Sequence, residues 1–141
     1  MWRQLIKKKI YLPDGINVQP SPIHGRGVFA CNTCKAGTVI ETAPVILLEK
    51  SERDFLQHTT LFGYYFVVAD ERTPVALGLG CSSLYNHAYQ ANAVYSISLK
   101  NKTISITAFK TIQAGEEITL NYNGSPNDPT PVYFPPEVIP A

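Results

Sequence analysis

Cysteine is scarce in this sequence, which has three cysteines among its 141 residues. An odd number of thiols does not make a disulfide framework, so a reducing compartment is the simplest interpretation. Cys31-x-x-Cys34 lacks the second pair that a zinc site needs, because Cys81 is the only other thiol. The pair also lacks the βαβ context of a redox motif. We therefore expect no metal site.

Excess charge and long apolar runs are lacking as well. The 12 basic and 11 acidic residues leave a formal net charge of +1, so direct binding to nucleic acid is not favoured. No apolar stretch approaches the ~20 residues that span a bilayer, so we expect no membrane partner. The basic residues 1–9 have no apolar run behind them, and we expect no signal peptide. The expected location is cytoplasmic, with the nucleus or host chromatin left open.

Helical patterns are rare, and short β patterns are common. A chain of this length, 45% hydrophobic, fits one domain with a modest core. Only residues 49–58 predict a helix, with Ser51 as N-cap and with Phe55 and Leu56 facing inward. We predict a mainly β fold with little helix and without the βαβ rhythm of nucleotide-binding parallel sheets.

The clearest strands form a hairpin between residues 94–99 and 103–109. Its alternation predicts four apolar side chains facing one core: Ile97, Leu99, Ile104 and Ile106. Residues 39–48 are β-branched and apolar, and we expect this strand to break at Pro44. Residues 70–74 predict an exposed connection. Other strands are predicted at residues 10–12, 16–19, 27–30, 61–68 and 118–122.

Two segments combine glycine with polar side chains. Residues 24–27 read His-Gly-Arg-Gly, and the glycines would let the backbone approach a ligand closely. The alternative is a tight turn before a strand. Asn86 and His87 follow a Gly-rich run at residues 78–80. An Asn side chain donates and accepts hydrogen bonds, which suits a purine edge or the amino acid end of a cofactor. The alternative is an Asn turn with a surface His.

The third segment, residues 115–122, reads Gly-Glu-Glu-Ile-Thr-Leu-Asn-Tyr. Alone it is a turn, two solvated acids and a strand. Tyrosines lie in separate motifs and could converge on a channel that holds an amine, since aromatic rings attract cations. These are Tyr64, Tyr65, Tyr85 and Tyr122. The alternative is that they form an amphipathic wall, as most tyrosines of a small β domain do.

Together and in this order, the segments resemble the signatures of the SET domain, the fold of most protein lysine methyltransferases. Residues 24–30 are similar to its N-terminal Gly-x-Gly motif, and residues 85–92 to its central Asn-His-Ser-x-x-Pro-Asn motif. Residues 115–122 are similar to its closing Gly-Glu-Glu motif, which ends in Tyr. Residues 61–66 look like the Tyr-bearing strand of the small stand-alone viral and bacterial members. The resemblance covers about residues 18–134.

The resemblance implies several small β-sheets around a C-terminal pseudoknot, in which the C-terminal segment threads a loop that follows His87. This arrangement is one of the few exceptions to the rule that chains are not knotted. We expect a single SET domain over residues 1–141, with a core of about 16–134. Residues 1–15 would be an N-terminal strand or extension, and residues 135–141 a tail.

The implied activity is methyl transfer from S-adenosyl-L-methionine, giving S-adenosyl-L-homocysteine, to a lysine of a protein substrate, a histone or another basic protein. The residues expected to bind the cofactor are His24, Gly25, Arg26, Gly27, Asn86, His87, Tyr122 and Phe134. Those expected to act in catalysis are Tyr122 and Tyr64, and those expected to line the substrate channel are Tyr64, Tyr85 and Tyr122. Small members can dimerise, so a homodimer stays open.

The sequence departs from the family pattern at Ala88 and Ala91, where Ser and Pro are usual. Two alternatives therefore remain: the chain is a catalytically inactive SET-fold interaction module, or it is a small β domain whose motif matches are accidental. No cysteine-rich segment follows Tyr122, so the zinc-bound lid of many members is absent from the sequence. Tyr133 and Phe134 are the candidates to cover the cofactor instead. The degree of methylation and the chosen lysine are not indicated.

Overall fold

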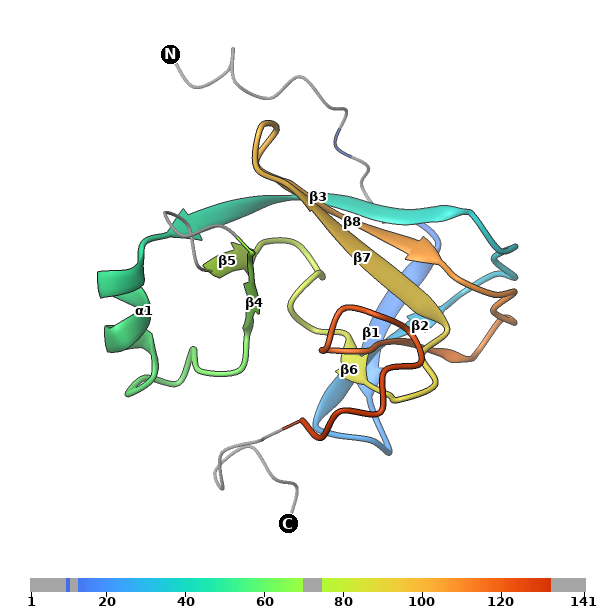
Figure 1. Ribbon diagram of the computed structural model, residues 1–141. Helices are drawn as coiled ribbons and strands as arrows, with labels where there is room; N and C mark the ends of the chain where they lie inside the picture. Colours follow the sequence, from blue (N-terminus) through green and yellow to red (C-terminus); the bar gives the residue numbers. More distant parts are fainter. Residues whose placement is uncertain (1–9, 11–12, 70–74, 133–141) are drawn as a thin grey trace.

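The computed structural model describes residues 10, 13–69 and 75–132 (Figure 1). The strand predicted at residues 10–12 falls mostly outside this part of the chain, and Tyr133 and Phe134 fall outside it entirely. The elements, in chain order, are β1 Ile16–Pro20, β2 Arg26–Ala30, β3 Val39–Leu48, α1 Lys50–Leu56, β4 Tyr65–Val67, β5 Val75–Gly78, β6 Asn86–His87, β7 Ala93–Ser98, β8 Thr103–Ala108 and β9 Glu117–Leu120.

The strands form small sheets that share members, as the mainly β prediction requires. Hydrogen-bonded neighbours follow the order β1-β2-β9-β7-β8-β3-β5-β4, and β6 also pairs with β9. One sheet contains β1, β2 and β9, a second runs from β9 to β3, and a third contains β3, β5 and β4. In Figure 1, α1, β4 and β5 lie at one end and β1, β2 and β6 at the other.

Strand β3 does not break at Pro44, so that prediction was wrong. The strand runs unbroken over Val39–Leu48, but it changes partners at the proline. Pro44 is the last residue paired with β8, and Val45 is the first paired with β5. Proline has no N–H to donate, so it suits a position where the ladder to one partner ends. Its carbonyl accepts a hydrogen bond from the Leu79 N–H at 3.0 Å.

The β7–β8 hairpin is confirmed, with one correction. Leu99 lies in the turn rather than in a strand, and Lys102 closes that turn at a φ of 52°. Ile104 and Ile106 are fully buried, but the polar residues Thr103 and Ser105 that alternate with them are buried as well. Strand β8 lies between β7 and β3, so both of its edges are paired, and its residues are buried on both faces except for half-buried Thr107. Buried Ser105 bonds to Thr42 of β3 at 3.1 Å.

Helix α1 is shorter than predicted, and its N-cap is Glu49 rather than Ser51. The Glu49 N–H donates to the Glu52 carboxylate at 2.9 Å, one half of a capping box that fixes this start. Phe55 is 78% exposed, so the prediction that it faces inward was wrong. The strand predicted from residue 61 begins at Tyr65, because residues 61–63 form a turn.

Strand β9 lies where the pseudoknot is predicted, at the crossing of the C-terminal segment with the loop after His87. It pairs antiparallel with β2 on one side and parallel with β6 and β7 on the other. The loop 88–92 joins β6 to β7 across β9, where Asn92 Nδ2 donates to the Glu117 carbonyl at 2.8 Å. Asn92 Oδ1 accepts from the Thr119 N–H at 2.9 Å. After β9 the chain returns against the same loop, since Asn121 Nδ2 donates to the Tyr89 carbonyl at 3.2 Å. This is the arrangement expected for the pseudoknot.

Candidate active site

The segment 24–27, called the glycine loop below, approaches β9 so closely at Gly27 that a side chain there would not fit. A Cβ at Gly27 would collide with the Glu117 carboxylate and lie 3.1 Å from Asn86 Nδ2. Gly25 adopts a φ of 44°, a conformation that favours glycine, and nothing lies within 4 Å of the place where its Cβ would be. The segment is therefore both a turn and a close contact between distant parts of the chain.

Asn86 is the link that holds this loop, and it is only 6% exposed. Its Nδ2 lies 3.1 Å from the carbonyls of His24 and Arg26, and 2.7 Å from Glu117 Oε1. It also lies 3.1 Å from Ser21 Oγ, and the Ser21 hydroxyl in turn donates to Glu117 Oε2 at 2.7 Å. An amide has two hydrogens, so these acceptors outnumber the protons that Asn86 can offer.

His87 supports the backbone at Tyr122. Its Nδ1 accepts a hydrogen bond from the Tyr122 N–H at 3.1 Å, and the two rings lie 5.1 Å apart. The His87 and Tyr89 rings pack edge to face, with their centroids 4.6 Å apart. Burial disfavours the charged imidazolium and lowers the pKa of His87. His87 is therefore a neutral acceptor at pH 7, where its Nδ1 is free of a proton.

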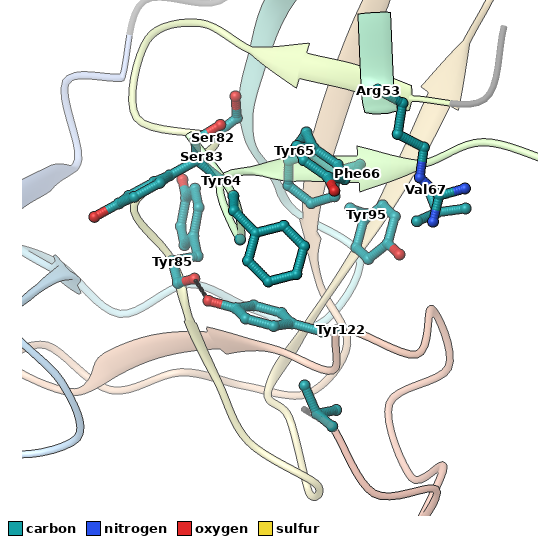
Figure 2. A pocket seen from close by; sticks show the side chains of 13 residues that line it. Arg53, Tyr64, Tyr65, Phe66, Val67, Ser82, Ser83, Tyr85, Tyr95 and Tyr122 are labelled. Atoms are coloured by element: carbon teal, nitrogen blue, oxygen red, sulfur yellow. Dashed lines mark hydrogen bonds between the residues drawn. The ribbon is translucent and has the colours of Figure 1, made fainter. Parts of the chain in front are cut away.

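The hydroxyl of Tyr122 is fixed on the backbone of the Asn-His segment. It donates to the Tyr85 carbonyl at 2.7 Å (Figure 2). Burial, together with the nearby Tyr64 and Glu117, raises the pKa of Tyr122 to about 12. The phenol is thus neutral at physiological pH. It can orient a reactant by hydrogen bonding, but it cannot serve there as a general base.

Tyr64, Tyr85 and Tyr122 line one cavity of about 260 Å³ (Figure 2). Tyr64 is half-exposed, whereas the Tyr85 ring is buried and its hydroxyl donates to the Glu41 carboxylate. Much of the cavity lining was not identified from the sequence. The unidentified lining residues lie outside the three motifs, in α1, the α1–β4 segment, β4, β7 and the residues before β6. Tyr65, which the sequence analysis named with the other three tyrosines, also lines the cavity, whereas the missed lining residues include Arg53, Phe62, Phe66, Ser82 and Tyr95.

The expectation from the sequence that Glu117 is solvated was wrong, and Glu41 was overlooked. Glu117 is half-buried and bonded to Ser21 and Asn86, whereas Glu116 is exposed. Glu41 was not identified at all, although a carboxylate within the apolar run 39–48 is a visible signal. His24 and Arg26 contact Asn86 through their backbone carbonyls. Phe134 lies outside the described residues.

In the described part of the chain, no group of three His, Cys, Asp or Glu side chains is arranged to hold a metal ion. Cys31, Cys34 and Cys81 are free thiols. None of the described helices is long and apolar enough to cross a bilayer.

The crossing of β6, β7 and β9 beside a tyrosine-lined cavity is the arrangement that the resemblance to the SET domain implies. The chain belongs to the SET domain family, whose model matches residues 25–123. It is 32% identical over 108 residues to a Schizosaccharomyces pombe histone-lysine N-methyltransferase specific for H3 lysine 37. That alignment covers 76% of this chain and 72% of the relative.

Solved structures support the same assignment. A Plasmodium falciparum protein assigned as a histone methyltransferase superposes with a TM-score of 0.61 at 29% identity, covering 85% of this chain and 97% of that one. A chain of the humanized Chaetomium thermophilum Polycomb Repressive Complex 2 gives a TM-score of 0.66 at 25% identity, covering 82% of this chain but 16% of that one. The predicted family, fold and class of enzyme, a protein-lysine methyltransferase, are thus confirmed.

Proposed function

We propose that the chain transfers a methyl group from S-adenosylmethionine to a lysine side chain of a histone or another basic protein, and that the residues predicted from its motifs carry this out. One observation supports the proposal most directly. The Tyr122 hydroxyl is fixed beside the Asn86-His87 segment and faces the same cavity as Tyr64. The S. pombe relative, which acts on H3 lysine 37, supports the choice of substrate class.

The glycine loop with Asn86 and His87 would hold the cofactor. The carbonyls of His24 and Arg26 and the Glu117 carboxylate form a set of acceptors that suits an ammonium group, such as that of an amino acid. Gly25 leaves the backbone open to close approach. When bound, the cofactor supplies a methyl group on a sulfonium, which is the electrophile of the reaction.

The tyrosine cavity would hold the lysine in its reactive form. A free lysine has a pKa of about 10.4 and is charged at neutral pH. Enclosure by aromatic rings removes water and favours the neutral amine. A phenol oxygen can accept a hydrogen bond as well as donate one, and the Tyr122 hydroxyl, which donates to the Tyr85 carbonyl, would orient that amine. Aligning two reactants in this way is the main contribution a protein can make to such a displacement.

The C-terminal residues would complete the cofactor site. Val132 lines the cavity, and its N–H donates to the Tyr89 hydroxyl at 3.3 Å. We propose that Tyr133 and Phe134, which follow directly, cover the cofactor. Deletion of residues 131–141 should then weaken S-adenosylmethionine binding strongly on calorimetric titration. Unchanged affinity would rule out this role.

Three further properties are part of the proposal. We treat residues 1–141 as one domain, place the activity in the cytoplasm or nucleus, and leave a homodimer open. Light scattering on the purified chain would separate a monomer from a homodimer.

The proposed function is tested by titrating S-adenosylmethionine and S-adenosylhomocysteine into the purified chain, followed by a transfer assay with labelled methyl groups on basic proteins. We expect one-to-one binding of both ligands and label in lysine. Binding without transfer to any substrate would indicate an inactive interaction module. Absence of both binding and transfer would contradict the proposal.

A further inference from the structure

Glu41 is a buried carboxylate that the proposed reaction does not use. It is the third residue of the largely apolar strand β3 and is 1% exposed. Its Oε2 accepts a hydrogen bond from the Tyr85 hydroxyl at 2.8 Å. Its Oε1 accepts one from the Cys81 N–H at 2.8 Å. Both oxygens are therefore bonded to the segment that leads into Asn86-His87.

The backbone of residues 78–83 packs closely against the Glu41 carboxylate. Gly80 adopts a φ of 65°, and a Cβ there would lie 2.6 Å from Glu41 Oε1. The next turn is closed by Ser82 Oγ, which donates to the Leu79 carbonyl at 2.7 Å. Ser83 Oγ donates to the Gly78 carbonyl at 3.0 Å. The chain before Tyr85 thus has little freedom to move while the carboxylate is in place.

Stability alone does not explain this residue. A carboxylate loses its hydration when it is buried, and this burial raises the pKa of Glu41. Apolar residues of similar size often replace buried charges without loss of stability. Ile106, the cross-strand partner of Glu41, and the nearby Ala43 are buried apolar residues, so the surroundings accept apolar side chains. Position, rather than stability, is what the carboxylate adds.

We infer that Glu41 is a positioning residue for methyl transfer, which acts through Tyr85 on Tyr122. The Glu41 carboxylate fixes the Tyr85 hydroxyl, and the carbonyl of the same Tyr85 fixes the Tyr122 hydroxyl at 2.7 Å (Figure 2). The inference rests on the proposed role of Tyr122. A small displacement of Tyr85 would release the Tyr122 hydroxyl, and misplacement of a reacting group by even a fraction of an ångström slows catalysis.

Three variants test the inference. Tyr85→Phe removes one hydroxyl and keeps the ring, so it should fold and should lower kcat about tenfold, the effect of one lost hydrogen bond near the reacting groups. Glu41→Leu should lower kcat by at least as much. Glu41→Gln should retain most of the activity, because its amide can still bond to both Tyr85 and Cys81. S-adenosylmethionine affinity, measured by calorimetry, should be unchanged in all three.

A matched control separates position from general stability. Thr42→Val removes a buried hydrogen bond, to Ser105, from the residue next to Glu41 on the same strand. We expect it to lower the melting temperature and to leave kcat of the folded protein unchanged. If Thr42→Val and Glu41→Leu lowered kcat equally, Glu41 would have only a structural role.

A double-mutant cycle tests the route through Tyr122. If Glu41 acts through the Tyr122 hydroxyl, Tyr85→Phe should have little further effect on kcat once Tyr122 is changed to Phe. Additive effects would overturn this route. Wild-type kcat in Tyr85→Phe would overturn the inference while leaving the proposed function intact. A wild-type chain without methyl transfer would overturn the proposed function and the inference with it.

Discussion

At the scale of single residues, Gly27 is the point of closest approach between the glycine loop and Glu117 of β9. A methyl group at this position would displace the Glu117 carboxylate and disturb Asn86. We predict that Gly27→Ala destabilises the fold by about 1–3 kcal/mol, as overpacking does. It should also weaken S-adenosylmethionine binding. Denaturant unfolding and calorimetry measure the two effects.

Gly15→Ala is the matched control, since nothing lies within 4 Å of the place where that Cβ would be. We expect its stability to stay within about 0.5 kcal/mol of wild type, as for ordinary surface substitutions. Equal effects of Gly15→Ala and Gly27→Ala would contradict the close-contact explanation.

Tyr122 gives a prediction about pH. Its raised pKa of about 12 means that the phenol keeps its proton at every pH below that value. The rate of methyl transfer should therefore rise with pH as the substrate amine loses its proton, without a contribution from Tyr122. In Tyr122→Phe the rate should be lower at each pH, but the midpoint of the rise should stay in place. A shifted midpoint would mean that Tyr122 titrates during catalysis.

At the scale of elements, the crossing loop depends on Asn92. Its side chain donates to the Glu117 carbonyl and accepts from the Thr119 N–H, so it pairs with β9 as a strand would. We predict that Asn92→Ala costs about 1–3 kcal/mol, because it leaves backbone groups of β9 without partners. Urea unfolding measures this cost. Exposed Asn17 on β1 is the control, and a loss as large in Asn17→Ala would refute the explanation.

Local sequence predicted some elements well and missed others for physical reasons. The β7–β8 hairpin and strands β1, β2 and β9 carry β-branched residues between clear turns, so they could be predicted. Strand β5 was missed because Ala76 and Gly78 have no β preference. Strand β6 is two residues long and exists only because β9 pairs with it. Exposed Phe55 shows that an apolar residue on a helix does not have to face the core.

At the scale of the whole molecule, the site is assembled from segments far apart in the chain. Ser21 bonds to Glu117 across 96 positions, Asn86 to His24 across 62, and Tyr122 to Tyr85 across 37. Local patterns do not predict such contacts, and only the resemblance to a known family brought the motifs together in advance. Residues outside those motifs, such as Glu41 and Arg53, were not predicted, and their contacts are known only from the folded chain.

The most direct test of the account is a transfer assay that compares wild type with Tyr122→Phe on histone and lysine-containing peptides, with S-adenosylmethionine as donor. Mass spectrometry locates any added methyl group. The account predicts lysine methylation by wild type and a rate lower by up to about 100-fold in the variant, as for the loss of a group that orients the reactants. Cofactor affinity should be equal in both. Equal rates in the two proteins, or a wild type that binds the cofactor but transfers no methyl group, would contradict it.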